Sequence, residues 1–503
     1  MQSLISTIAA HAAAQPGRAA ILQDRTVIDY AGLNAAIQSA SAQLHGTGDG
    51  TVAIGLENSA AWVISDLSVL ALGRPCLPLP PFFTSAQQAH AIRNSGAGWL
   101  LTDRPEVHGA MLQEQSIDAE RQSDINVAGI RIAQFRLAIA PVRLPADTAK
   151  ITYTSGTTGT PKGVCLSGAT MESVARALAT ATEMNGADRH LCLLPLATLL
   201  ENLGGVYAPL FSGACVLPSA GRQDSDASAI DRDYGSTLAG MLEHAQASTA
   251  IMIPQMLHAL VATVEAGTPR PSALRFLAVG GARVSPTLLA RAADAGLPVF
   301  EGYGLSECAS VVALNTLHDK RPGSVGRPLP HARIEIASDG EILVGGTTFL
   351  GYAGNEAAAG KVWPTGDLGY LDRDGFLHLT GRKKDLFITA FGRNVSPDWV
   401  ESELTLQPAI AQAWVHGEAR PWNTAVIVPR AGATSETITA AIAAANRNLP
   451  GYAQVSRWLP AAMPFSSESG ELTSNGRLRR TAIAKRYAHL IDQLYLEHSC
   501  EFS

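Results

Sequence analysis

The chain has 503 residues, more than a single hydrophobic core usually supports, and so the sequence predicts at least two domains. Hydrophobic residues make up 46% of the chain and charged residues 16%, a composition of folded globular domains that argues against long disordered regions. With a net charge of −6, the chain lacks the basic surface of a nucleic-acid-binding protein, so an anionic ligand must be held by a local cluster of donors.

The six cysteines are scattered along the chain without CxxC pairs or metal-ligand spacing, a pattern typical of free thiols in a reducing cytoplasm. The N-terminal residues have no basic stretch ahead of their apolar ones, so we expect no secretory signal peptide. The most apolar segment, residues 60–72, contains Asp66 and is too short to span a bilayer. We therefore expect a soluble, cytoplasmic protein with no membrane span and no nucleic-acid partner.

Residues 1–150 alternate between helical and strand patterns, which implies a mostly parallel sheet covered by helices. The expected helices are 4–14, 30–44 and 60–72, and the expected strands are 51–55 and 99–102. We expect residues 75–81 to form a proline-rich connection. Residues 103–141 are weakly patterned, and we expect them to be peripheral.

Residues 151–164 read ITYTSGTTGTPKGV. A β-prone start leads into small hydroxyl residues interleaved with glycines, and Pro161, Lys162 and Gly163 close the segment. It offers backbone N–H groups, hydroxyls and one cation with little steric bulk, which is what a chain of phosphates requires. Because Pro161 rather than glycine precedes Lys162, the segment is not a Walker loop, and it indicates a phosphate-binding loop of another lineage.

The alternation of strands and helices continues for another 150 residues, so doubly wound α/β is the leading fold class. The expected strands are 191–195, 214–217, 250–253, 276–279 and 299–300, and the expected helices are 169–181, 201–211, 254–265 and 286–295. In such folds ligands bind beyond the carboxyl ends of the strands. Two polar motifs follow strand ends: Gly280-Gly281-Ala282, and Glu301 to Glu307 (EGYGLSE).

From residue 338 onward short strands alternate with Asp-Gly turns, which indicates antiparallel β structure. Within this part we expect Pro364-Thr365-Gly366-Asp367 to set a carboxylate on a tight turn. The charged segment 381–385 is a plausible linker to a small α+β domain with helices at 397–405 and 435–446. The last stretch, 472–485, is expected to mix a turn with several arginines.

Five motifs occur in a fixed order: YTSGTTGTPKGV, GYGLSE, TGD, GRKKD with FGRNVSP, and NGRLRR. In this set and its spacing, the chain resembles the adenylate-forming (AMP-binding) superfamily, and most of all its long-chain acyl-CoA synthetases. The resemblance implies an α/β fold with a large N-terminal domain, residues 1–383, made of doubly wound sheets and a small antiparallel β part. A small mobile α+β domain, residues 384–503, would act as a lid.

The resemblance also implies the reaction. A carboxylic acid attacks the α-phosphorus of ATP to give acyl-AMP and pyrophosphate, and a thiol then takes the acyl group and releases AMP. Such chemistry depends on positioning and on neutralising charge. The implied cofactors are ATP and Mg²⁺, with CoA or the phosphopantetheine of a carrier protein as the thiol.

Residue roles follow from motif positions. The residues that would hold the β- and γ-phosphates are Thr154, Ser155, Gly156, Thr157, Thr158 and Lys162. Gly281 and Ala282, with Tyr303 of the GYGLSE motif, would sandwich the adenine, and Gly304 of the same motif would be among the residues that bind the cofactor. Ser306 would bind the α-phosphate, and Glu307 would bind Mg²⁺.

The remaining roles concern the ribose, the hinge and the thiol. Asp367 would accept both ribose hydroxyls, and Arg382 would reinforce that side. Lys384 occupies the position of the hinge about which the small domain would rotate. Gly392 would let the pantetheine arm pass, since a side chain there would obstruct its tunnel.

Two positions depart from the pattern of the superfamily. Arg477 stands after Gly476 where a lysine normally crosses the active site, and arginine is not equivalent to lysine. Thr198 stands where a gating histidine is common. The expected lining of the acyl pocket is Thr198, Glu201, Asn202, Val206, Gly280 and Val311. Its Leu- and Ala-rich surroundings favour a fatty or other apolar acid over an amino acid.

Three functions therefore remain open. The leading one is an ATP-dependent acid–thiol ligase that makes an acyl thioester. The second is an acyl-AMP ligase that loads a carrier protein in lipid or polyketide assembly. The third, motivated by Arg477, is a degenerate member that binds nucleotide with little turnover.

Overall fold

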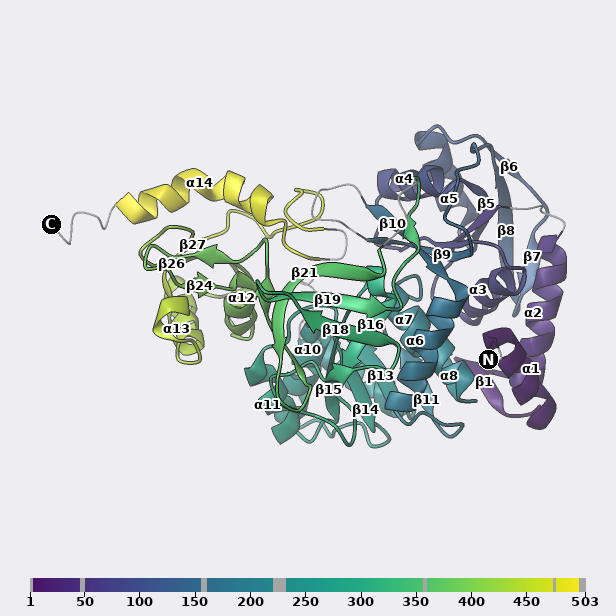
Figure 1. The fold of residues 1–503 in the computed structure, drawn as a ribbon, viewed down its shortest axis with the longest axis horizontal. Coiled ribbons are helices and arrows are strands. Elements are labelled where there is room, and N and C mark those ends of the chain that lie inside the picture. The colour runs from purple at the N-terminus through teal and green to yellow at the C-terminus, as the bar shows by residue number, and fades with distance from the viewer. Residues whose placement is uncertain are drawn as a thin grey trace.

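A large body built from the N-terminal and central parts of the chain carries a smaller group of C-terminal elements at one end (Figure 1). This computed structural model describes residues 3–45, 50–154, 161–219, 232–355, 360–473 and 476–496. Four residues that the sequence assigns to phosphate binding lie outside these ranges: Ser155, Gly156, Thr157 and Thr158. Among the described residues, no helix combines the length and apolar character needed to cross a membrane.

The first sheet has nine strands in the order β17-β16-β15-β14-β13-β11-β12-β1-β2. They are β1 (Ala19–Gln23), β2 (Thr26–Asp29), β11 (Arg189–Cys192), β12 (Cys215–Pro218), β13 (Thr249–Met252), β14 (Phe276–Val279), β15 (Val299–Leu305), β16 (Ser310–Leu314) and β17 (Arg327–Pro328). The central neighbours are parallel, and antiparallel pairs close both edges. This arrangement confirms the expected doubly wound α/β class.

Helices cover both faces of this sheet. One face packs against α9 (Arg232–His244), α10 (Pro254–Glu265) and α11 (Pro286–Asp294). The other packs against α6 (Gly168–Ala181) and a continuous helix of three parts: α7 (Leu199–Glu201), a π-helical segment (Asn202–Tyr207) and α8 (Ala208–Phe211). A π-helical segment of this kind changes the phase of a helix and often marks a functional region.

The second sheet runs β20-β10-β9-β4-β3-β5-β8-β6, with β7 paired to β8. Its strands are β3 (Thr51–Gly55), β4 (Cys76–Pro78), β5 (Ala97–Thr102), β6 (Ala119–Arg121), β7 (Ile125–Val127), β8 (Ile130–Leu137), β9 (Thr148–Thr154), β10 (Lys162–Ser167) and β20 (Gly351–Tyr352). The helices of this part are α1 (Leu4–Ala14), α2 (Tyr30–His45), α3 (Ala60–Ala71), α4 (Ser85–Ser95) and α5 (Pro105–Glu114).

Two expectations for this region are wrong. Residues 75–81 contain the buried strand β4, which lies between β3 and β9 although prolines surround it. Residues 103–141 are not peripheral, because they supply α5 and also β8, whose antiparallel pairing with β5 extends the sheet. The alternation of β8 is interrupted by consecutive buried residues, 132–135, which obscured its period of two.

A third, antiparallel sheet lies beside the first, in the order β18 (Ala332–Ile336), β19 (Glu341–Gly346), β21 (Val362–Leu371) and β22 (Leu377–Arg382). It confirms the expected small antiparallel part. Asp367, however, is not on a tight turn, because it lies inside β21. The pairing of β19 with β21 is irregular between Pro364 and Leu368, and Gly366 there has a φ of +73°. Asp367 therefore projects from an irregular, bulged strand that is held on both sides.

The C-terminal elements form an α+β unit around the sheet β25 (Ile410–His416), β26 (Asn423–Pro429) and β27 (Val455–Pro460). The remaining elements are β23 (Phe387–Ile388), β24 (Asn394–Val395), α12 (Pro397–Thr405), α13 (Ser435–Asn446) and α14 (Arg480–Leu496). The segment 472–485 turns as expected up to Arg479, but α14 then continues for 17 residues. Its buried face recurs at every fourth residue: Ile483, Tyr487, Ile491 and Tyr495.

Candidate active site

An open cleft of about 2650 Å³ lies between the large body and the C-terminal elements. Most of the residues that the motifs single out line it. From the large body these are Thr154, Gly281, Ala282, Tyr303, Gly304, Ser306, Glu307, Asp367 and Arg382. The C-terminal part adds Lys384 and Arg477. The fold thus brings together residues that are up to 323 positions apart, from Thr154 to Arg477.

Asp367 is a carboxylate of the cleft that is held by two hydrogen bonds. Its Oδ2 accepts a hydrogen bond of 2.7 Å from the Tyr303 hydroxyl, and its Oδ1 accepts one of 2.8 Å from Arg382 Nε. Asp367 and Arg382 are paired across β21 and β22, so the strand register itself positions the ion pair. Burial, followed by the charge of Asp367, raises the pKa of Tyr303, which keeps its hydroxyl a donor. The carboxylate is therefore fixed in orientation and retains lone pairs for a ligand.

The phosphate loop is anchored by two paired strands. Thr154 ends β9, Lys162 begins β10, and the two residues face each other in register. The Lys162 ammonium lies 5.4 Å from the centre of the Tyr352 ring, a cation–π contact. The Tyr352 hydroxyl in turn donates to Glu307 Oε1 at 3.0 Å. Tyr352, which sequence reasoning missed, therefore joins the phosphate strand to the carboxylate expected to bind Mg²⁺.

Glu307 lies on a short 3₁₀ turn, Ser306–Cys308, between β15 and β16. The preceding Gly304 is required by the packing of those strands, because a Cβ there would collide with the Ser310 carbonyl. The packing of β15 against β16 therefore explains why residue 304 is a glycine, independently of any contact with a nucleotide. The Glu307 carboxylate is an oxygen donor of the kind that Mg²⁺ prefers, so the residue fits the expected metal.

The small residues after β14 form the opposite wall. Gly281 has a φ of +84°, and a Cβ on Gly280 would lie 3.3 Å from the Gly302 carbonyl. Both features leave a flat backbone surface that a planar ring can approach. Arg477 closes this wall from the C-terminal side, where its Nη2 donates to the Gly281 carbonyl at 2.8 Å.

Positive charge gathers around the fixed carboxylate. Arg382, Lys384 and Arg477 all lie within electrostatic reach of Asp367. Burial in the cleft lowers the pKa of Lys384, and the neighbouring arginines lower it further. Asp385, Asp398 and Glu307 also lie within electrostatic reach of these cations, so the cleft holds a mixed set of charges in which three cations are available to a polyanionic ligand.

Lys162 and Gly392 lie outside the lining of the cleft. Lys162 is exposed and is the first residue of β10, the strand that follows the expected phosphate-binding segment in sequence. Gly392 is exposed with a φ of +71°, and among the described residues nothing lies within 4 Å of a Cβ placed there. The left-handed backbone is by itself a reason for a glycine at this position.

The cleft extends between the first sheet and the helix 199–211. Of the residues expected to line an acyl pocket, Thr198, Gly280 and Val311 line the cleft, together with Gly204 and Ala208. Glu201, Asn202 and Val206 do not, which corrects the expected lining. Gly204 and Ala208 line the cleft, whereas Glu201 and Asn202 are buried and at most 1% exposed.

The buried polar residues of this helix are instead part of two networks. Asn202 and Tyr207 surround the buried ion pair of Lys150 with Asp66, in which Lys150 Nζ donates to Asp66 Oδ1 at 2.8 Å. Glu201 accepts from the backbone N–H of Leu194 at 3.1 Å and pairs with a histidine. The first network ties α3, β9 and the π-helical segment together.

Comparison with known proteins places this site in a family. Residues 8–353 match the AMP-binding enzyme family, and residues 384–499 match the AMP-binding enzyme C-terminal domain. The chain belongs to the AMP-binding enzyme family. Together the two matches account for most of the chain, in agreement with the order of its motifs.

Members of the AMP-binding enzyme family that are similar to this chain act on different acids. A long-chain-fatty-acid–CoA ligase of Mycobacterium bovis is 28% identical over 521 residues, covering 86% of both chains. A 2-succinylbenzoate–CoA ligase of Bacillus subtilis is 30% identical, covering 81% of this chain and 84% of its own.

Solved structures agree with the fold of the AMP-binding enzyme family. The O-succinylbenzoate coenzyme A synthetase of Bacillus subtilis in complex with AMP aligns with a TM-score of 0.74 at 25% identity, covering 95% of this chain and 98% of that one. Its complex with ATP and magnesium ion aligns with a TM-score of 0.73. The protein is an AMP-forming acid–thiol ligase.

Proposed function

We propose that this ligase uses ATP and Mg²⁺ to convert an acid with an apolar body into acyl-AMP and then transfers the acyl group to CoA. The observation that carries the proposal is the cleft itself. It joins a fixed carboxylate, three cations and Glu307 to a branch lined by apolar residues. The named activities of similar proteins support CoA as the acceptor.

The roles proposed for the nucleotide side follow from this geometry. Asp367 accepts the ribose hydroxyls, since Tyr303 and Arg382 hold it in place and leave it further lone pairs. Gly281 and Ala282 offer the surface for adenine. Glu307 holds Mg²⁺, whose charge offsets that of the triphosphate when it is bound. Thr154, Ser306 and Lys162 contact phosphates, together with residues 155–158 of the loop.

The two domains have separate duties in this proposal. Residues 1–383 bind ATP and the acid, and residues 384–503 act as a lid that turns at Lys384 between the half-reactions. In the present arrangement Arg477 donates to the Gly281 carbonyl, and we assign this arrangement to the adenylation half-reaction. A full guanidinium charge there supports an active ligase over a degenerate one.

The test is to incubate the purified protein with ATP, Mg²⁺, CoA and single acids from a panel of fatty and aryl acids. Mass spectrometry should detect the acyl-CoA, with AMP released in equal amount. A second arm replaces CoA with a phosphopantetheinylated carrier protein. Thioester formation on the carrier and not on CoA would contradict the proposed acceptor, and no thioester in either arm would contradict the proposal as a whole.

A further inference from the structure

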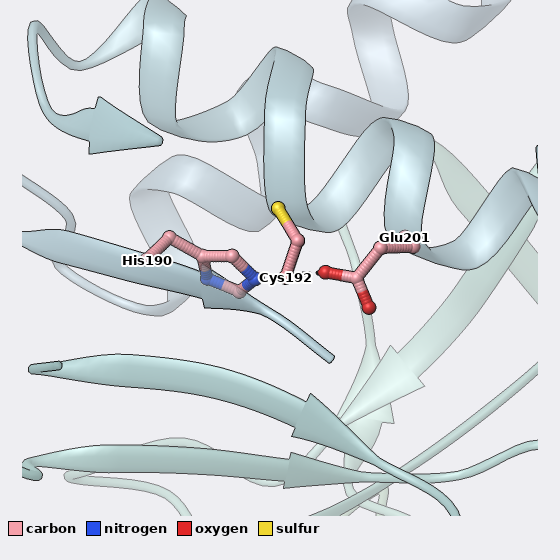
Figure 2. Close-up of side chains that lie close together, drawn as sticks. All are labelled: His190, Cys192 and Glu201. Carbon is pink, nitrogen blue, oxygen red and sulfur yellow. Dashed lines mark hydrogen bonds and ion pairs between the residues drawn. The ribbon is translucent and has the colours of Figure 1, made fainter. Parts of the chain in front are cut away.

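Three polar side chains, His190, Glu201 and Thr249, meet beside the cleft, and Figure 2 shows the first two of them. His190 of β11 and Glu201 of the helix approach each other, with His190 Nε2 at 3.1 Å from Glu201 Oε1. On the other side of the ring, His190 Nδ1 lies 2.9 Å from Thr249 Oγ1 on β13. All three residues are at most 2% exposed. The motifs of the superfamily do not include His190 or Thr249.

The arrangement is a hydrogen-bonded chain and not a metal centre. His190, Cys192 and Glu201 have ligand atoms within 4.8 Å of one another. Cys192 Sγ, however, points to the helix in Figure 2, where it donates to the Gly205 carbonyl at 3.6 Å. Burial raises the pKa of this thiol well above its usual value, so it stays protonated and is a poor ligand. His190 and Glu201 are already paired with each other.

The contacts of Glu201 bear on the direction of hydrogen-bond donation along Thr249, His190 and Glu201. Glu201 Oε2 accepts from the Leu194 N–H, and its Oε1 faces His190 Nε2. In the tautomer that donates from Nε2 to Glu201, the imidazole accepts at Nδ1, and Thr249 donates its hydroxyl proton to His190. The Thr249 oxygen then has lone pairs for a donor inside the pocket.

The glycine at position 205 is part of this construction. A Cβ on Gly205 would collide with the Glu201 carboxylate and would lie 2.8 Å from His190 Nε2. On the pocket side, a Cβ on Gly204 would lie 2.7 Å from Ile251 Cδ1. The paired glycines of the π-helical segment therefore make room for His190 and Glu201 on one side and for the Ile251 side chain on the other.

Thr249 and His190 both line the cleft. They pair in register near the amino ends of β13 and β11, whereas Ile253 and Gly280 mark the carboxyl ends beside the nucleotide. Four residues of strand separate Thr249 from Ile253, a span on the order of 13 Å. A hydroxyl that reaches Thr249 thus belongs to the remote end of the acid.

We infer that the chain Thr249–His190–Glu201 is a specificity site that binds a hydroxyl group at the remote end of the acid substrate. The apolar walls accept the body of the acid, and the Thr249 oxygen accepts the hydroxyl proton. Such a site favours a hydroxylated acid because an analogue without the hydroxyl leaves Thr249 without its partner in a dry pocket. The inference rests on the proposed function and narrows its substrate class.

The experiment compares matched acids: decanoic acid with its ω-hydroxy derivative, and cinnamic acid with its para-hydroxy derivative. Affinity is measured by calorimetric titration, and kcat/KM by thioester formation. We expect the wild type to favour a hydroxylated member by roughly 10-fold or more, in whichever of the two series fits the pocket. Thr249→Val should abolish the preference and Thr249→Ser should restore it.

Thr182→Val is the matched control, because Thr182 also lines the cleft but donates its hydroxyl to the Leu178 carbonyl of its own helix. It should leave the preference intact. Equal binding of both members of each pair by the wild type, or an unchanged preference in Thr249→Val, would overturn the inference. If no acid forms a thioester, the proposed function fails, and the titration alone decides whether the hydroxyl is recognised.

Discussion

Arg477 of the C-terminal domain donates a hydrogen bond to the Gly281 carbonyl across the cleft, at 2.8 Å. Because this hydrogen bond joins the C-terminal domain to the expected adenine wall, it can form only in the present orientation of the two domains. The guanidinium also lies within electrostatic reach of Glu307 and Asp367. One side chain thus links the orientation of the lid to the charge of the nucleotide site.

Arg477→Ala should lower acid-dependent ATP–pyrophosphate exchange by roughly 100-fold or more, because it removes a positive charge from a site of phosphoryl transfer. Arg477→Lys keeps the charge and should retain exchange to within about 10-fold of the wild type. Thioester formation from synthetic acyl-AMP measures the second half-reaction alone. An equal loss in both half-reactions on Arg477→Ala would count against a role confined to adenylation.

A buried carboxylate holds the lid in the same orientation. Glu403 of α12, 2% exposed, accepts from the Ser285 hydroxyl at 2.6 Å and from the Thr287 hydroxyl at 3.0 Å, at the N-terminus of α11. These bonds must break if the lid rotates. Glu403→Gln weakens a charge-assisted contact and should reduce pyrophosphate exchange several-fold without slowing thioester formation from acyl-AMP.

Ser285→Ala combined with Glu403→Gln gives the matched control for that contact. If the two residues act through one hydrogen bond, the double variant should lose no more than the stronger single variant. Additive losses would show that Glu403 affects exchange by another route.

Asp367→Asn should raise the KM for ATP by about 10-fold or more with a smaller change in kcat, since the amide cannot accept as many hydrogen bonds as the carboxylate. Tyr303→Phe keeps the ring but removes one donor to Asp367, so its effect should be several-fold smaller. Steady-state kinetics with varied ATP gives both values. A KM unchanged in Asp367→Asn would remove this residue from the nucleotide site.

Lys384→Ala should impair thioester formation more than pyrophosphate exchange, if the lid turns at this position between half-reactions. Lys383→Ala is the neighbouring control, because Lys383 is tied to Asp339 and Glu341 on the large body. Comparable losses in both half-reactions on Lys384→Ala would contradict a hinge at this residue.

The motifs located the nucleotide side of the cleft because each is contiguous in sequence. Tyr303, Asp367 and Arg382 come from three strands, and the resemblance of their motifs to those of the adenylate-forming superfamily implied that they meet. Tyr352 had no such signal, since its contact with Glu307 depends on the pairing of β20 with the distant β10. Glu201 and Asn202 were misplaced because the phase of a helix with a π-helical segment is not readable from residue types.

The agreement between the expected and observed bounds of helices and strands also depends on the strength of the local sequence pattern. The strand and helix patterns of β3, β14, α10, α12 and α13 are strong and uninterrupted, and their bounds agree with the expectation. The strand β4 was missed because prolines dominate its surroundings, although its neighbours on both sides enforce a strand there. Tertiary pairing outweighs local composition in such a segment.

A separate prediction concerns stability. His108 is 3% exposed, with Nδ1 at 2.7 Å from the Thr102 hydroxyl, and its burial lowers the pKa from 6.5 to about 4. Between these pH values the unfolded chain binds a proton that the folded chain does not. Stability should therefore be complete above the unfolded pKa and should decline as the pH falls toward 4.

The contribution of His108 to that decline is about 2 kcal/mol between pH 7 and pH 5. Denaturant unfolding at both pH values should show a smaller decline for His108→Gln than for the wild type. His489→Gln, at an exposed histidine of α14, is the control and should follow the wild type. An identical decline in all three proteins would contradict the assignment to His108.

The central claim is that this cleft forms acyl-AMP, and exchange of radiolabelled pyrophosphate into ATP tests it most directly, because exchange requires only the first half-reaction. With a panel of fatty and aryl acids, with and without remote hydroxyls, and no CoA present, the wild type should catalyse exchange that depends on the acid and on Mg²⁺. Exchange with no acid of the panel, by either the wild type or Arg477→Lys, would contradict the claim.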